Sequence, residues 1–235
     1  MKILSMALIF ILHYLVSGVN GQSLHGELVT EENEILRVRV NHWENEEGVQ
    51  NVVQYFSKSG RLVLEEFGQF SKKPLCFQKL RVTDYIKGRK ESFVYGEKAC
   101  LITFKRTSEA RLKEKRLRII ENTIHGTMMN HYLKKHLNQL KEGKRVEFRL
   151  LVPSRLRTYK FYFILIGEKS LDNHECYVIK MKPSSIILKA MVPASFYTIQ
   201  KNPPHLLLKY DGIVSPRSSK GKVQTGMLRL ALDLP

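Results

Sequence analysis

A lone amphipathic helix among strand-like segments is the feature that most limits what this chain can fold into. Residues 127–143, TMMNHYLKKHLNQLKEG, carry apolar side chains at spacings of three and four, which places them on one side of a helix. Thr127 is a candidate N-terminal cap, and Gly143 between lysines is typical of a helix end. In a protein otherwise made of strands, such a stripe predicts a helix that plugs or covers the sheet.

Most other segments alternate apolar and polar residues with a period of two, as half-buried strands do. Residues 146–152 and 223–232 are examples, and residues 159–166 are apolar on both faces, as in a strand covered on both sides. Residues 57–60, SKSG, predict a hairpin turn, and residues 184–192, SSIILKAMV, predict another strand. The expected fold class is mainly β, a strongly curved antiparallel sheet (half-barrel or barrel) with one amphipathic helix on the concave face.

Two polar segments interrupt this pattern. Residues 42–48, HWENEEG, predict an acidic loop, in which Trp43 is either a packing anchor or an exposed aromatic at a ligand mouth. Residues 111–120, RLKEKRLRII, are densely basic, which favours a solvated edge strand protected against aggregation. A phosphate-binding strip is the alternative, but its cations would not all share one face.

The N-terminus predicts export. Residues 1–21 combine Lys2, an apolar core and small residues, the pattern of a signal peptide cleaved after Gly21, with Gly18 as the alternative site. An uncut membrane anchor is disfavoured because the apolar run is short. We therefore expect a periplasmic protein with a single β-rich domain over residues 22–235, since no Pro, Gly or Ser-rich linker divides it.

The charge of the chain is strongly basic, with a formal net charge of +17 that falls to +16 when Lys2 is removed with the signal peptide (17 − 1 = 16). An exported protein is not expected to meet nucleic acid, so the candidate counterparts are anionic lipid head groups, lipopolysaccharide, acidic glycans or an acidic protein. The alternative is that the charge only keeps the protein soluble.

No constellation of residues predicts chemistry. Cys76, Cys100 and Cys176 lack metal-site spacing, which favours buried thiols, with a bridge between Cys76 and Cys100 as the alternative. The eight histidines also lack ligand spacing, so we expect no metal and no cofactor. Asp84 and Asp211 are the candidate carboxylates of a glycan hydrolase, although such residues more often anchor turns. We expect no catalytic residues and no enzyme activity.

Several segments resemble known proteins. Residues 143–148 (GKRVEF), 151–156 (LVPSRL), 206–213 (LLLKYDGI) and the hairpin at 55–62 (YFSKSGRL) are similar to a family of exported bacterial proteins of unknown function. The layout is distantly similar to the LolA-type lipoprotein-carrier half-barrels. That resemblance implies acyl chains held between a concave sheet and helices, although those proteins have several helices where this sequence shows one.

These observations favour a non-catalytic periplasmic binding or carrier protein for an apolar or lipid-like ligand. A structural or partner-binding envelope protein without a ligand, or a glycan hydrolase, are the alternatives. The predicted apolar lining, which would otherwise form a dry core, is Met129, Tyr132, Leu133, Leu137, Tyr159, Phe161 and Phe163. The predicted basic surface, a candidate contact for an anionic membrane, is Lys87, Arg89, Lys90, Arg155 and Arg157. We expect no nucleic-acid partner, and a monomer.

Overall fold

The computed structural model describes residues 20–72, 75–96, 99–118 and 122–232. Nearly all of the predicted signal peptide lies outside the described residues, but Asn20 and Gly21 already belong to the first strand. The strands are β1 (Asn20–Thr30), β2 (Ile35–Glu44), β3 (Gly48–Phe56), β4 (Leu62–Lys72), β5 (Leu75–Asp84), β6 (Lys90–Tyr95), β7 (Cys100–Lys105), β8 (Lys113–Leu117), β9 (Thr123–Ile124), β10 (Val146–Val152), β11 (Arg157–Leu171), β12 (His174–Pro183), β13 (Ser195–Gln200), β14 (Leu207–Val214) and β15 (Gln224–Leu232).

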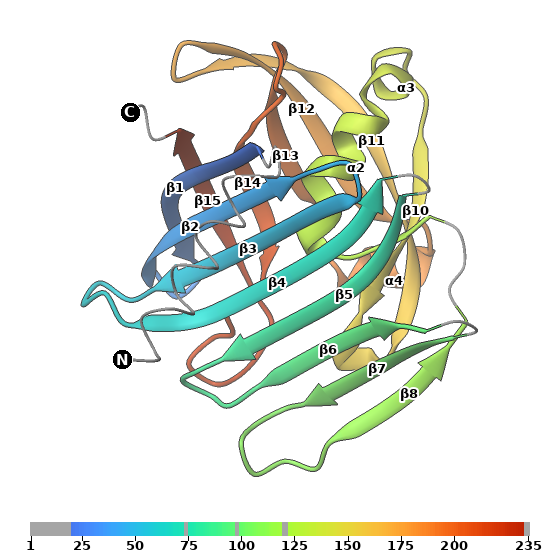
Figure 1. Ribbon diagram of the computed structural model, residues 1–235. Coiled ribbons are helices and arrows are strands. Elements are labelled where there is room, and N and C mark those ends of the chain that lie inside the picture. Colours follow the sequence, from blue (N-terminus) through green and yellow to red (C-terminus); the bar gives the residue numbers. More distant parts are fainter. Residues whose placement is uncertain (1–19, 73–74, 97–98, 119–121, 233–235) are drawn as a thin grey trace, which may run out of the picture.

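All fifteen described strands form one sheet, in the order β8-β7-β6-β5-β4-β3-β2-β1-β15-β14-β13-β12-β11-β10-β9. The first and last strands pair in the middle, for example at Leu28 and Leu228. Neighbours are antiparallel except β9 and β10. The sheet curls so that the arm ending in β8 faces the arm of β10 to β12, with helix α2 between them (Figure 1). The predicted fold, a curved antiparallel sheet with a helix on its concave face, is confirmed, and the sheet is open at β8 and β9.

The predicted helix lies in the expected place but is broken. It comprises the 3-10 turn η1 (Gly126–Met128), α2 (Met129–Lys135) and α3 (Leu137–Lys141). The break is at His136, whose backbone turns to φ −106°. The cap is not Thr127, because His125 accepts the hydrogen bond of the Thr127 backbone N–H instead. The predicted end at Gly143 is confirmed, since its φ is +76°, a conformation that glycine adopts without a steric penalty.

Other sequence expectations are corrected. Residues 184–192 do not form a strand, because β12 and β13 already pair with each other up to Met181 and Ser195. The chain between those strands forms helix α4 (Ile186–Met191). Strand β2 runs on to Glu44, so the loop after it is shorter than predicted. The hairpin at Gly60, with φ +84°, and the basic edge strand β8 are both confirmed.

Tyr132, on the apolar stripe of the helix, packs against the arm of the sheet that contains β10 and β11. Tyr132 lies against Phe148 and Phe163 of β10 and β11, with ring centroids 5.7 Å and 6.5 Å away. The remaining stripe residues Leu133, Leu137 and Leu140 are buried in the same cluster. The prediction that residues 159–166 are covered on both faces holds only in part. Tyr162 is buried beneath Arg145 and Lys189, but Lys160 is exposed and Ile166 is 47% exposed.

The described cysteines form no Cys76–Cys100 bridge. Cys100 retains its thiol, which donates to the Leu117 carbonyl at 3.0 Å, and the Cys176 thiol donates to the His174 carbonyl at 3.3 Å. Both side chains are buried, and burial raises the pKa of each thiol. The interpretation of these two cysteines as buried thiols is confirmed. Across the described ranges, no helix has the length and apolar character needed to cross a membrane.

Candidate functional site

A cavity of about 560 Å³ lies between the concave face of the sheet and the start of the helical segment. One wall is apolar and comes from strands on both sides of the β1–β15 pair. Its aliphatic residues are Leu24, Leu28, Val40, Val53, Leu206, Leu207, Ile213, Val214, Leu228 and Leu230, with Tyr197 and Tyr210 beside them. The facing wall is the polar side of the helical segment, which supplies Asn130, His131, Lys134 and Lys135.

The amphipathic helix explains why this space is not filled by protein. Tyr132 of its apolar stripe is buried against Phe148 of β10 and Phe163 of β11. The polar side of the same helix therefore faces the opposite arm, where the sheet presents apolar side chains such as Val40 and Val53. A polar helix face cannot close over an aliphatic wall by dry packing, so a space remains between them.

A row of polar side chains crosses the sheet at one end of the cavity. Asn51 of β3 lies opposite His42 of β2 in the register, and His42 Nδ1 is 2.6 Å from Asn51 Oδ1. Asn51 also donates to the Thr127 carbonyl at 2.6 Å. Burial opposes ionisation of Glu44, but hydrogen bonds from Lys72 and His42 outweigh it and lower the Glu44 pKa. This end of the cavity is therefore polar and joined to the helix.

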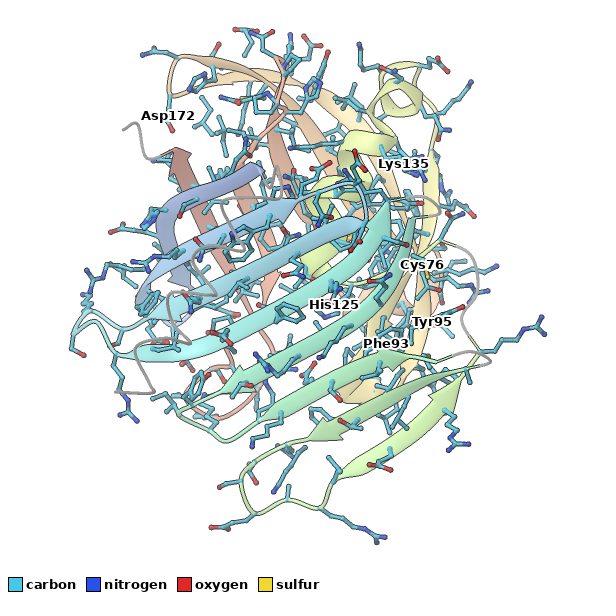
Figure 2. The ribbon with its side chains drawn as sticks, in the orientation of Figure 1. Cys76, Phe93, Tyr95, His125, Lys135 and Asp172 are labelled. Atoms are coloured by element: carbon cyan, nitrogen blue, oxygen red, sulfur yellow. The ribbon has the colours of Figure 1, made fainter. Side chains whose placement is uncertain are left out.

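The helix brings cations and an unpartnered amide to the same end. Burial lowers the pKa of Lys134, although the charge of Glu44 opposes that shift. Within the described part of the chain, neither Lys134 nor Lys135 forms an ion pair with a carboxylate. Asn130 Oδ1 is buried and has no hydrogen-bond partner among the described residues. Lys135, the last residue of α2, is exposed, whereas His125, which caps η1, is buried; both are labelled in Figure 2.

The other polar group at the cavity is a buried carboxyl. Glu66 Oε1 accepts a hydrogen bond of 3.0 Å from the Tyr55 hydroxyl, and both residues border the cavity. Burial raises the pKa of Glu66, while hydrogen bonds from Ser215 and Tyr55 and the charge of Arg89 oppose that shift. Arg89 in turn donates to the Ser215 carbonyl at 2.9 Å. This carboxyl is thus already held by protein donors.

The structure places most of the predicted apolar lining residues in the packed core and not at the cavity. Met129 borders the cavity. The other helix residues of the set, Tyr132, Leu133 and Leu137, are buried in the core with the strand residues Phe161 and Phe163. Tyr159 is partly buried and packs on the same core. The structure therefore brings six of the seven predicted residues together in packed protein beside the cavity, and one at its edge.

The predicted basic surface is also divided. Lys90, Arg155 and Arg157 are exposed. Lys87 is half-buried and donates to the Arg217 carbonyl at 2.9 Å. Arg89 does not belong to the surface, because its side chain is only 5% exposed and lies 3.5 Å from the Glu91 carboxylate. The prediction that the charged side chains of this turn are exposed is wrong for Arg89. Arg89 lies one residue before β6, and its guanidinium donates a hydrogen bond to the Ser215 carbonyl.

The residues proposed for chemistry take structural positions. Asp84 is buried, and its Oδ1 accepts hydrogen bonds from the backbone N–H groups of Ile86 and Lys87, as a turn anchor does. Asp211 is exposed on β14. Within the described ranges, no group of three His, Cys, Asp or Glu side chains is arranged to hold a metal ion.

The predicted site does not include the polar residues of the cavity, although the strand pattern of the sequence indicates them. His42 continues the inward-facing series Leu36, Val38 and Val40 of β2, and it interrupts their apolar character. Asn51 lies between Val49 and Val53, and Glu66 lies between Leu64 and Gly68, again at inward-facing positions. Polar residues at the apolar phase of neighbouring strands indicate a cavity or a partner.

No family model matches the sequence, and no curated protein matches it. The solved structures that match it include the following three. A β-barrel-like protein of the domain of unknown function DUF1849 from Brucella abortus is 9% identical with a TM-score of 0.49, covering 92% of this chain and 98% of that one. A DUF1329 family protein from Desulfovibrio piger is 8% identical with a TM-score of 0.27, covering 96% and 90%. A LolA superfamily protein from Nitrosomonas europaea, of the group that the sequence resembles, is 9% identical with a TM-score of 0.23, covering 94% and 89%.

Proposed function

We propose that this chain is a non-catalytic binding or carrier protein for an amphiphile with an apolar tail and an anionic head. The observation that carries this proposal is the cavity of about 560 Å³ with an aliphatic wall on the sheet and a polar wall on the helix. Its size is within the range of about 300–1,000 Å³ that is usual for small-molecule sites. The predicted signal peptide, residues 1–21, supports a periplasmic location.

The apolar wall favours a hydrocarbon tail. Leu28, Val214 and Leu228 belong to this wall, and their side chains form no hydrogen bonds with water or with a ligand. When a ligand covers such a wall, the free energy of binding gains about 25 cal/mol for each Å² of apolar surface removed from water. An acyl or alkyl chain is the simplest occupant that supplies this contact without needing polar partners.

The helix wall favours an acidic head. Lys134 and Lys135 bring two ammonium groups to the cavity, while Glu44, the carboxylate at that end, is bonded to Lys72. Asn130 Oδ1 is a buried acceptor without a described partner, so a hydroxyl or N–H of the ligand head would satisfy it. A carboxylate or phosphate beside a hydroxyl or amide group fits these three residues together.

The test is calorimetric titration of the delipidated mature chain with dodecanoate, 1-dodecanol and dodecyltrimethylammonium. Dodecanoate should bind most tightly. Val53→Phe places a ring in the cavity and should weaken binding by about tenfold or more, since a well-packed ligand cannot share that volume. Val52→Phe is the matched control, because Val52 is the preceding residue of β3 and does not border the cavity.

The head and the tail are tested separately. Lys134→Gln with Lys135→Gln should weaken dodecanoate binding by roughly fivefold to tenfold and leave 1-dodecanol unchanged. Lys141→Gln, an exposed lysine of α3, is the control. Equal affinity for all three amphiphiles would contradict the preference for an acidic head group. It would leave the proposed site for the apolar tail supported. Binding that Val53→Phe does not weaken, or no binding at all, would overturn the proposal and favour a structural envelope protein.

A further inference from the structure

Helix α4 exposes a cluster of aliphatic side chains to solvent. Ile186 is 83% exposed, and Ile187 and Met191 are each 74% exposed, the highest values among the large apolar side chains described. Single exposed apolar residues are ordinary on protein surfaces. Three within six residues form a compact apolar projection, and such projections mark sites that another surface covers.

This projection is attached to the sheet by its polar and backbone atoms. The Ser184 backbone N–H donates to the Lys160 carbonyl at 2.9 Å, which fixes the start of the α4 loop to β11. The Lys189 ammonium lies 5.6 Å from the centre of the Tyr162 ring. α4 therefore rests beside β12, with Lys189 over Tyr162 of β11 (Figure 1). Its aliphatic side chains are exposed to solvent.

The surface beneath α4 is strongly basic. Phe161 and Phe163 face the core, so Lys160 and Tyr162, which alternate with them, face the convex side of β11. The same alternation places Lys180 and Lys182 of β12 on that side. We term the convex cations of β10, β11, β12 and α4, together with the residue before β10, the basic face. They are Arg145, Arg149, Lys160, Lys180, Lys182 and Lys189.

The basic face carries little compensating charge. Residues 145–149, 160–164, 180–182 and 186–191 contain one carboxylate, Glu147, which pairs with Arg145 at 2.9 Å. Six cations and one carboxylate leave a formal charge of +5 (6 − 1 = 5). Lys180 and Lys189 also lie over aromatic rings, but those contacts leave their charges uncompensated.

We propose that α4 and the basic face dock this protein on an anionic lipid bilayer. Ile186, Ile187 and Met191 would enter the boundary between head groups and acyl chains, and the cations around them would contact lipid phosphates. Aliphatic residues flanked by lysines are the chemistry that membrane-surface helices use. A second copy of this chain fits less well, because a two-fold interface would oppose one +5 face to another. The inference does not depend on the cavity being occupied.

The test is co-sedimentation of the full mature chain with vesicles of phosphatidylglycerol and phosphatidylcholine, or of phosphatidylcholine alone. The chain should bind the anionic vesicles at least about tenfold more tightly, and this preference should fall steeply with salt. Ile186→Gln, Ile187→Gln and Met191→Gln together should weaken binding by about tenfold or more while preserving the fold, because α4 contains no buried residue. Leu112→Gln with Val223→Gln, also exposed and apolar, is the matched control.

The cations are tested in the same assay. Lys160→Gln with Lys182→Gln should weaken binding to anionic vesicles by roughly tenfold. The comparison variant changes the exposed cations of the basic surface predicted from the sequence, Lys90→Gln, Arg155→Gln and Arg157→Gln. It should weaken vesicle binding less than Lys160→Gln with Lys182→Gln does. Equal binding to neutral vesicles, undiminished binding of the α4 variant, or a greater loss from the turn variant would overturn the proposal. So would a dimer, seen by analytical ultracentrifugation, that the α4 variant dissociates.

Discussion

The side-chain amide of Asn51 donates a hydrogen bond of 2.6 Å to the backbone carbonyl of Thr127. This contact joins β3 to the helical segment, and so links the two walls of the cavity. His42 holds the amide in place from β2, because its Nδ1 lies 2.6 Å from Asn51 Oδ1. The position of the helix relative to the apolar wall thus depends on a polar residue at an inward-facing position of the sheet.

Asn51→Ala should lower the free energy of unfolding by about 1–3 kcal/mol, because it leaves the buried Thr127 carbonyl without its donor. Urea denaturation measures the change. The neighbouring residue Gln50 is exposed on the other face of β3, so Gln50→Ala should change stability by less than about 0.5 kcal/mol. Equal losses in the two variants would show that the Asn51–Thr127 bond does not hold the helix.

Gly68→Ala tests how closely the helical segment approaches β4. A Cβ at this position would lie 2.2 Å from Thr127 Oγ1 and 2.7 Å from Thr127 Cβ. The clash should cost about 1–3 kcal/mol in thermal or urea unfolding. Thr127→Ala in the same chain should recover part of that loss. Gly167→Ala is the control, since a Cβ there meets no atom within 4 Å, and a similar cost at both glycines would contradict the close approach.

The sequence predicts the fold well because the fold depends on local periodicity. The alternation in residues 146–152 and the apolar run in residues 159–166 both correspond to observed strands, β10 and β11. Residues 184–192 have the composition of a strand, yet the structure forms α4 there, because the strands before and after them, β12 and β13, already pair with each other. Strand pairing is a property of the whole sheet, and composition alone does not determine it.

The site is less predictable because it depends on which side of the helix faces which arm of the sheet. The period of three and four identifies the apolar stripe, but it does not show that Tyr132 packs against Phe148 and not against β2. The cavity then lies on the polar side, beside Asn130 and Lys134. The inward-facing polar residues His42 and Asn51 are the sequence features that would have indicated the correct arm.

The pH dependence of stability should reflect His125. Burial, and secondarily the charge of Arg89, lower the pKa of His125 from 6.5 to about 4. The unfolded chain therefore binds this proton before the folded chain does, so the stability contribution is present above about pH 6.5 and is lost as the pH falls toward 4. The loss should be on the order of 3 kcal/mol between pH 7 and 4. His125→Gln should lose less over this range in urea titrations, and an unchanged pH dependence would contradict the assignment.

Glu66 should give the stability a pH dependence opposite to that of His125. Its pKa is raised in the folded protein, chiefly by burial, so its contribution is present below the unfolded value of 4.5 and is lost as the pH rises through the folded pKa. Glu66→Gln keeps an acceptor for the Tyr55 hydroxyl and removes the titration. Relative to the unmodified chain, this variant should gain stability between pH 5 and pH 9, as measured by urea unfolding at each pH. The exposed residue Glu27, as Glu27→Gln, should show no such gain.

The open edge of the sheet gives the last prediction. Strand β8 pairs with β7 on one side only, and its residues Lys113 and Lys115 are exposed. Charged side chains on an edge strand oppose pairing with another chain. Lys113→Val with Lys115→Val should therefore produce oligomers and aggregates, detected by light scattering, while the melting temperature of the remaining monomer changes little. Lys141→Val with Lys220→Val adds the same apolar surface away from any strand and should stay monomeric. Aggregation of both variants to the same extent would show that hydrophobicity alone, and not the β8 edge, is responsible.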